Sequence, residues 1–178
     1  RVPIGERPAR YSDRANVGHW EADSMQFSDY KTVLALHERS SRLIWIRRQP
    51  TKQAASVARS IESLLAPLPK KLRQSITFDN GTEFADHHIL RKSLGIKTYF
   101  CDPYAPWQKG GVENAIGRLR RQLPRKTDLS TVSTRQLQQL AALYNHTPRK
   151  CLGYQTPAEV FSKVLHFKCE STSPPSRG

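Results

Sequence analysis

The sequence lacks the features that mark secreted and membrane proteins. No apolar run approaches the roughly 20 residues that a membrane-spanning helix requires, and no signal-peptide pattern stands out. Cysteine is scarce, because the chain has only Cys101, Cys151 and Cys169 and no CxxC spacing. Such a scattered set argues against a disulfide framework and favours a reducing compartment. We therefore expect a cytoplasmic protein that has no membrane partner.

Acidic side chains are also few. The 15 Asp and Glu residues stand against 29 Lys and Arg residues, which gives a net charge of +14 and a pI near 10.1. An excess of this size indicates a polyanionic partner, and nucleic acid is the first candidate. A merely soluble basic surface is the alternative. Binding to an anionic membrane is less well supported, since no basic amphipathic helix with a broad apolar face stands out.

The pattern along the chain divides it into an arm, a core and a tail. Residues 1–17 carry four arginines and two prolines without periodicity, which is typical of a linker or arm. Residues 168–178 are predicted to form a disordered tail, since they are rich in serine and proline. Residues 18–167 are long enough to form one domain with its own hydrophobic core.

The core has a strand-rich half followed by a helix-rich half. In the first half, apolar residues predict strands over 20–25, 31–37 and 43–46, followed by a helix over 51–65. The second half is predicted to contain strands over 76–79 and 96–100, helices over 82–94, 110–123 and 134–145, and a last short helix from Thr156. This order predicts an α/β fold with a five-stranded mixed sheet and helices on both faces.

Three carboxylates stand at informative places in this order. Asp79 ends the strand 76–79 and is followed by the turn pair Asn80-Gly81, and Glu113 begins an arginine-rich helix 34 positions later. Asp23 lies in the first strand. Each has an ordinary alternative: Asp79 as a turn residue, Glu113 as an acid in a first helical turn, and Asp23 as an exposed strand-end acid.

Taken together, these carboxylates predict a metal site. Magnesium requires hard oxygen ligands, and it keeps water and phosphate as its remaining ligands. Two strand residues hold such ions rigidly, while a helix residue can adjust when the substrate arrives. Two divalent ions about 3.5–4 Å apart are the arrangement that phosphodiester chemistry uses. We therefore expect Asp23, Asp79 and Glu113 to be both metal ligands and catalytic residues.

The helix that carries Glu113 has two distinct faces. Glu113, Gly117 and Arg120 share one face, which combines a metal ligand, a gap and a cation for phosphate. The other face is apolar and is expected in the core. Gly117 costs the helix roughly 1 kcal/mol relative to alanine, which indicates a packing or substrate reason for it. A poorly specified surface helix is the alternative.

Basic and polar residues around this helix are candidates for DNA contact. Contact with phosphate is the functional interpretation, and solvated surface charge is the alternative. Trp107 lies in the preceding loop, where its ring either stacks on an unpaired base or pins the loop onto the core. The predicted DNA-binding residues are Trp107, Lys109, Asn114, Arg118, Arg120 and Arg121.

Several motifs, in this order, resemble a known family. The sequence is similar to the catalytic core of insertion sequence 30 transposases, with retroviral integrases as more distant relatives. The resemblance covers nearly the whole chain, from about Arg1 to Phe161. The motifs that carry it are His19 to Asp23, Phe78 to Phe84, Tyr99 to Gly110, Val112 to Asn114, Pro148 to Tyr154 and Thr156 to Phe161.

The resemblance implies a fold, a chemistry and a set of partners. The fold would be ribonuclease H-like, with Asp23 on the first strand, Asp79 after the fourth and Glu113 on the following helix. Two Mg²⁺ or Mn²⁺ ions would be the cofactors. Water would first cut a phosphodiester at the element's end to free a 3′-hydroxyl, and that hydroxyl would then attack target DNA. The partners would be DNA of the element ends and target, with at least a dimer on DNA at the bacterial nucleoid.

Two other functions remain open from the sequence. A catalytically silent DNA-binding or dimerising fragment of a decayed element would keep the basic surface without the reaction. A ribonuclease H-like nuclease would act on RNA–DNA hybrids. Such nucleases usually have a larger set of carboxylates, and the Trp107 loop has no role in them.

Overall fold

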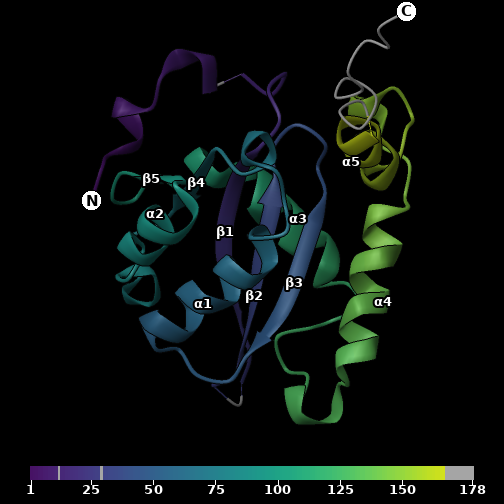
Figure 1. Cartoon of the computed structure of the whole chain (residues 1–178). Helices are drawn as coiled ribbons and strands as arrows, with labels where there is room; N and C mark the ends of the chain where they lie inside the picture. The colour runs from purple at the N-terminus through teal and green to yellow at the C-terminus, as the bar shows by residue number, and fades with distance from the viewer. Residues whose placement is uncertain (12, 29, 167–178) are drawn as a thin grey trace, which may run out of the picture.

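A five-stranded mixed sheet forms the centre of the molecule, as seen in a computed structural model that describes residues 1–11, 13–28 and 30–166 (Figure 1). Strands β1 (His19–Gln26), β2 (Thr32–Glu38) and β3 (Ile44–Gln49) form an antiparallel meander. Strands β4 (Ser75–Phe78) and β5 (Lys97–Phe100) continue the sheet parallel to β1, in the order β3-β2-β1-β4-β5. The predicted α/β fold is confirmed.

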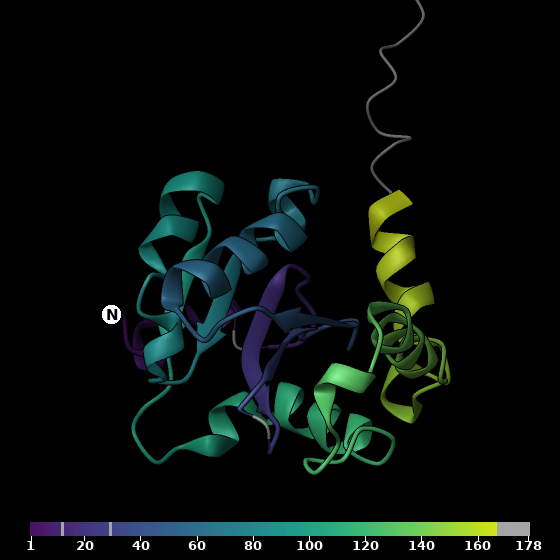
Figure 2. The same cartoon turned by 90° about the horizontal axis from the view of Figure 1, so that it is seen from below.

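Helices cover both faces of this sheet (Figure 2). Helices α1 (Ala54–Leu65) and α2 (His88–Leu94) lie on one face, and α3 (Gly110–Leu119) lies on the other. Helix α4 (Thr134–Asn145) packs beside the edge strand β3, and α5 (Pro157–His166) follows it. The remaining 3₁₀ turns are η1 (Ile4–Glu6), η2 (Ala9–Tyr11), η3 (Lys70–Leu72), η4 (Thr82–Phe84), η5 (Pro106–Lys109), η6 (Leu129–Thr131) and η7 (Lys150–Leu152). No helix among the described residues is long and apolar enough to cross a membrane.

The sheet separates two hydrophobic cores. Side chains alternate along β1, so Trp20 and Ala22 enter the core under α1, while Met25 enters the core under α3. Glu21 and Asp23 have the same parity as Met25 and therefore lie on the face that carries α3. This alternation puts two acidic residues of one strand beneath a single helix.

Two helices differ from the sequence prediction. The expected helix over 82–94 is replaced by η4 and a shorter α2, because Phe84 turns into the core, where its ring stacks 4.7 Å from that of Phe78. The expected helix over 110–123 ends at Leu119. Leu123 is still buried, but it precedes Pro124, and the residue before a proline disfavours helical geometry.

The first residues run along the sheet edge. Pro3 forms a parallel bridge with Phe100, and the Phe100 amide donates a hydrogen bond to the Val2 carbonyl over 2.9 Å. The expected arm over 1–17 is thus in contact with β5, and its role as a separate arm stays a prediction. The expected tail over 168–178 and Cys169 lie outside the described residues.

Candidate active site

Two of the predicted carboxylates lie close together on neighbouring strands, Asp23 within β1 and Asp79 directly after β4. Strands β1 and β4 are parallel and pair Glu21 with Thr77. Asp23 and Asp79 each lie two residues further on, so their side chains emerge side by side on the same face. This juxtaposition needs only parallel pairing and the two-residue repeat of a strand.

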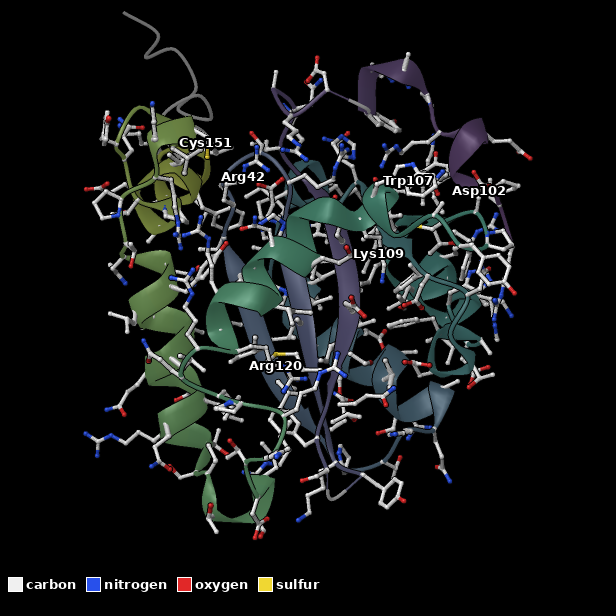
Figure 3. All side chains as sticks on the ribbon, turned by 180° about the vertical axis from the view of Figure 1, so that it is seen from behind. Arg42, Asp102, Trp107, Lys109, Arg120 and Cys151 are labelled. Atoms are coloured by element: carbon white, nitrogen blue, oxygen red, sulfur yellow. The ribbon has the colours of Figure 1, made fainter. Side chains whose placement is uncertain are left out.

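A lysine occupies the space between these two carboxylates. The Lys109 Nζ lies 2.9 Å from Asp79 Oδ2 and 3.4 Å from Asp23 Oδ2, and it donates a hydrogen bond to the Ala22 carbonyl over 3.3 Å. Only 3% of Lys109 is exposed. The sequence predicted Lys109 as a DNA contact, but η5 turns its side chain inward, so it lies within the site (Figure 3).

Burial and neighbouring charges have opposite effects on the pKa values of Asp23 and Lys109. Burial raises the pKa of Asp23 and outweighs the lowering effects of Lys109 and of the Ser24 amide. Burial alone would lower the pKa of Lys109, but Asp23 and Asp79 outweigh it and leave that pKa raised. The carboxylates therefore keep the ammonium charged, while burial favours the protonated form of Asp23.

Glu113 lies on the first turn of α3, along the same groove as Asp23. This groove has a volume of about 610 Å³ and is also lined by Gly117 and Arg120. Burial raises the pKa of Glu113; Lys109 lowers it, and the carboxylates of Asp23, Glu21 and Asp79 raise it further. The three predicted acids therefore interact electrostatically. Among the described residues, however, no three His, Cys, Asp or Glu side chains form one compact metal-binding group.

The donor set fits hard divalent cations. Asp23 and Asp79 present carboxylate oxygens to a single cationic centre, which is the ligand chemistry that Mg²⁺ and Mn²⁺ require. Asp79 also has the expected turn role, because its Oδ1 accepts a hydrogen bond from the Gly81 amide over 2.9 Å. One oxygen of Asp79 thus fixes the loop while the other faces the cation.

Glu21 is a further buried acid that sequence reasoning passed over. Its Oε2 accepts a hydrogen bond from the Val112 amide over 2.8 Å, and its Oε1 lies 3.2 Å from Arg39 Nε. Glu21 precedes Asp23 by two residues, and Val112 directly precedes Glu113. A single hydrogen bond therefore ties the strand of one predicted ligand to the helix of another. The available signal was the two-residue repeat of the strand, which places Glu21 on the same face as Asp23.

Gly111 allows this close contact. A Cβ atom at position 111 would lie 2.6 Å from Glu21 Oε2 and 3.0 Å from the His37 ring. Since such approaches are too short for a real side chain, only glycine lets α3 rest on Glu21. Packing against Glu21 therefore explains why position 111 is a glycine.

The other predicted DNA contacts lie outside the group formed by Lys109, Asp23 and Asp79. Arg120 lines the groove, where its Nη2 donates to the Gln26 carbonyl over 2.8 Å and its guanidinium covers the Phe27 ring at 4.6 Å. Arg118, Arg121 and Asn114 are exposed on or just after α3. Trp107 is 75% exposed, so its ring does not pin the loop onto the core. Figure 3 shows Trp107 and Arg120 at separate ends of this region, with Lys109 between them.

Comparison with known proteins agrees with this architecture. The family model described as "Integrase core domain" matches residues 13–106. The catalytic core domain of BIV integrase has a similar fold, with a TM-score of 0.67, 25% identity, and coverage of 86% of this chain and 99% of that one.

Several sequence relatives are transposases of bacterial insertion elements. The transposase of IS1086 from Cupriavidus metallidurans is 39% identical over 92% of this chain and 49% of its own length. InsI of IS30A from Escherichia coli is 38% identical over 91% and 42%, and the transposase of IS4351 from Bacteroides fragilis is 36% identical over 93% and 51%. The chain thus spans about half the length of the curated relatives it matches. It belongs to the integrase core domain family, and within that family it resembles the IS30-type transposases.

Proposed function

We propose that residues 18–167 form the catalytic domain of a DNA transposase, which cuts DNA at a 3′ end and joins that end to target DNA. The observation that carries this proposal is that Asp23 and Asp79 converge on the buried ammonium group of Lys109, with Glu113 along the same groove. The transposase relatives support the class of reaction.

Each part of the site has a separate role in this proposal. Asp23, Asp79 and Glu113 would hold two Mg²⁺ or Mn²⁺ ions, which when bound supply Lewis-acid polarisation of a phosphate and a more acidic attacking hydroxyl. Lys109 neutralises Asp23 and Asp79. Arg120 presents its charge along the groove, where it would hold a phosphate of the strand. Trp107, at the other end of the site, would stack on an unpaired base.

The overall reaction has two balanced steps. In the first, water adds to a phosphodiester and the bond to the 3′-oxygen breaks, which leaves a 3′-hydroxyl and a 5′-phosphate. In the second, that hydroxyl attacks a target phosphodiester and displaces a new 3′-hydroxyl. DNA of the element ends and the target would be the partners. We further propose that at least two copies act together on DNA, at the nucleoid of a bacterial cell.

A nicking assay tests this function. The chain is incubated with supercoiled plasmid and Mg²⁺ or Mn²⁺, and nicked circles are separated on a gel; Asp79→Asn serves as the inactive variant. We expect nicking by the wild type alone and none in EDTA. Equal amounts of nicked plasmid with the wild type and with Asp79→Asn would refute the proposal and favour a catalytically silent DNA-binding fragment.

A further inference from the structure

A second, strongly basic pocket lies across α3 from the carboxylate groove. It has a volume of about 250 Å³ and is bounded by the first turn of α3, the β2–β3 turn and the segment that follows α4. Its lining contains no acid among the described residues, although the buried Glu21 lies behind His37. Four arginines line it: Arg14, Arg42, Arg118 and Arg149. In Figure 3, Arg42 and Cys151 lie on one side of α3 and Lys109 on the other.

Several polar groups at this pocket have no partner within the part of the chain that the structure describes. The Nδ1 of His37 and the Nε atoms of Arg42 and Arg149 are buried and make no hydrogen bond. His37 is 1% exposed, and its Nδ1 lies 4.0 Å from Glu21 Oε2, which is too long for a hydrogen bond. Buried donors and acceptors without partners are rare in proteins, so this pocket has unused capacity to bind a polar ligand.

The pocket is also strongly electropositive. Burial lowers the pKa of His37, and the charges of Arg42, Arg14, Arg39 and Arg149 act in the same direction, so that the pKa falls to about 3. The ring is therefore neutral, and the positive charge comes from guanidinium groups. Arginine pairs with phosphate through two parallel hydrogen bonds.

The residue that delivers one of these charges has a left-handed backbone conformation. Arg42 has a φ of +65°, a left-handed conformation that non-glycine residues rarely adopt. Its amide donates to the Glu38 carbonyl over 2.9 Å, which closes the β2–β3 turn. Conformations of this kind cost about 1–3 kcal/mol and cluster at ligand sites. The turn thus holds a charged side chain at the pocket in a conformation that glycine or asparagine would adopt more easily.

The exposed ridge of α3 between the two sites is low. Gly110 and Gly117 are seven residues apart and share one face of the helix. A Cβ atom added to either would meet no atom within 4 Å. No packing contact therefore explains Gly117, and the space above it leaves room for the backbone of a DNA strand beside the exposed side chains of Glu113 and Asn114.

We propose that this arginine pocket binds a backbone phosphate of DNA, while the same strand crosses α3 to the carboxylate groove. The inference rests on the proposed function, since it assigns a second anchor on the same DNA. A free anion such as inorganic phosphate offers the same chemistry, and the experiments below separate the two sources.

Charge-neutralising variants give the first test. Arg42→Gln/Arg118→Gln removes two charges from the pocket and leaves Arg149, which donates to the Tyr144 carbonyl, in place. Arg59→Gln/Arg91→Gln removes two exposed charges from α1 and α2, on the other face of the sheet. DNA affinity is measured in EDTA by fluorescence anisotropy at several salt concentrations, with circular dichroism as the folding check.

The expected result is specific to the pocket. The pocket variant should bind DNA roughly tenfold more weakly, and the slope of log K against log salt should fall by about 1 to 2. The control variant should stay within about threefold of the wild type. Coincident curves for the two variants would overturn the inference. Because binding is measured without metal, plasmid nicking by the wild type would still report separately on the proposed function.

Cys151 provides a second, direct test. Its side chain is exposed at the pocket, whereas Cys101 is buried and its pKa is raised to about 11, first by burial. In a Cys169→Ser background, the rate of alkylation by N-ethylmaleimide should fall at least fivefold when DNA binds, and by less in Arg42→Gln/Arg118→Gln. No protection by DNA would refute the assignment. Equal protection by millimolar inorganic phosphate and by saturating DNA would make the pocket a free-anion site instead and also refute it.

Discussion

The ammonium group of Lys109 lies 2.9 Å from Asp79 Oδ2 and 3.4 Å from Asp23 Oδ2, where the proposed function requires a metal ion. A side chain of the same protein thus supplies positive charge to two carboxylates that would otherwise repel each other. Lys109 and a divalent ion then compete for the same oxygens, and the competition can be measured.

Replacing Lys109 by methionine should separate stability from metal affinity. Without metal, Lys109→Met leaves Asp23 and Asp79 unneutralised, and we expect a loss of about 2 kcal/mol in the free energy of unfolding. Mn²⁺ should bind roughly tenfold more tightly, because no ammonium competes for the oxygens. Calorimetric titration with Mn²⁺ and urea unfolding in EDTA measure the two effects. Lys92→Met on α2 is the control, and unchanged Mn²⁺ affinity in Lys109→Met would contradict the competition.

Removing the charge of Glu113 should abolish DNA cleavage and leave DNA binding intact. Glu113→Gln keeps the side chain's shape, so DNA affinity should stay within about threefold of the wild type, while the nicking rate falls by at least roughly 100-fold. Glu62→Gln on α1 neutralises an acid on the other face of the sheet and should nick normally. Filter binding and plasmid nicking measure the two properties; loss of DNA binding in Glu113→Gln would argue against a role confined to the metal site.

Glu21 should act as a positioning residue rather than a catalytic one. Glu21→Ala removes the acceptor of the Val112 amide and the partner of buried Arg39, so we expect a loss of about 3 kcal/mol of stability. Glu21→Gln keeps an oxygen for the Val112 amide and should retain more of both stability and nicking. The discriminating measurement is Mn²⁺ affinity at a temperature where both variants are folded. Equal affinity in the wild type and Glu21→Ala would mean that this hydrogen bond does not position α3.

The two glycines of α3 should respond oppositely to alanine. Gly111→Ala places a methyl group 2.6 Å from Glu21 Oε2 and should cost about 2 kcal/mol. Gly117→Ala points into open space and should stabilise the helix by about 0.5–1 kcal/mol, while it narrows the groove and weakens DNA binding. Thermal unfolding and anisotropy measure these changes. A stabilised Gly117→Ala variant with unaltered DNA affinity would show that the gap does not serve the substrate.

Acidification should have opposite effects on metal binding and on the stability that Asp23 and Glu113 contribute. The folded pKa values of Asp23 and Glu113 are raised, first by burial, so protonation begins above the ordinary values of about 3.9 and 4.3. The folded protein binds these protons more tightly than the unfolded chain. Asp23 and Glu113 therefore contribute stability to the metal-free fold as pH falls through this window and lose that contribution as pH rises, whereas Mn²⁺ affinity falls with pH. Buried His37, whose pKa is lowered to about 3, acts on stability in the opposite direction. Thermal unfolding of the wild type and Asp23→Asn in EDTA is therefore compared at each pH, and the difference between the two curves gives the sign of the Asp23 contribution.

The positions of the carboxylates followed from the sequence because they depend on local rules. Asp79 follows an apolar strand, and Glu113 begins a helix, so each could be assigned from its neighbours. The position of Lys109 could not, because it depends on how η5 turns before α3. The arginine pocket was also hidden, since Arg42 and Arg149 are over 100 residues apart and meet only in the folded chain. Sequence neighbours show where a side chain starts, and tertiary packing decides what it meets.

The separation of the two hydrophobic cores has a practical consequence for experiments on this protein. Glu21, Asp23 and the proposed anchor all lie on the α3 face, while α1 and α2 rest on the opposite core. A fluorophore or surface tether on an exposed position of α2, such as Lys92, would leave the DNA-facing side open. Single molecules held in this way would present groove and pocket together to a strand in solution.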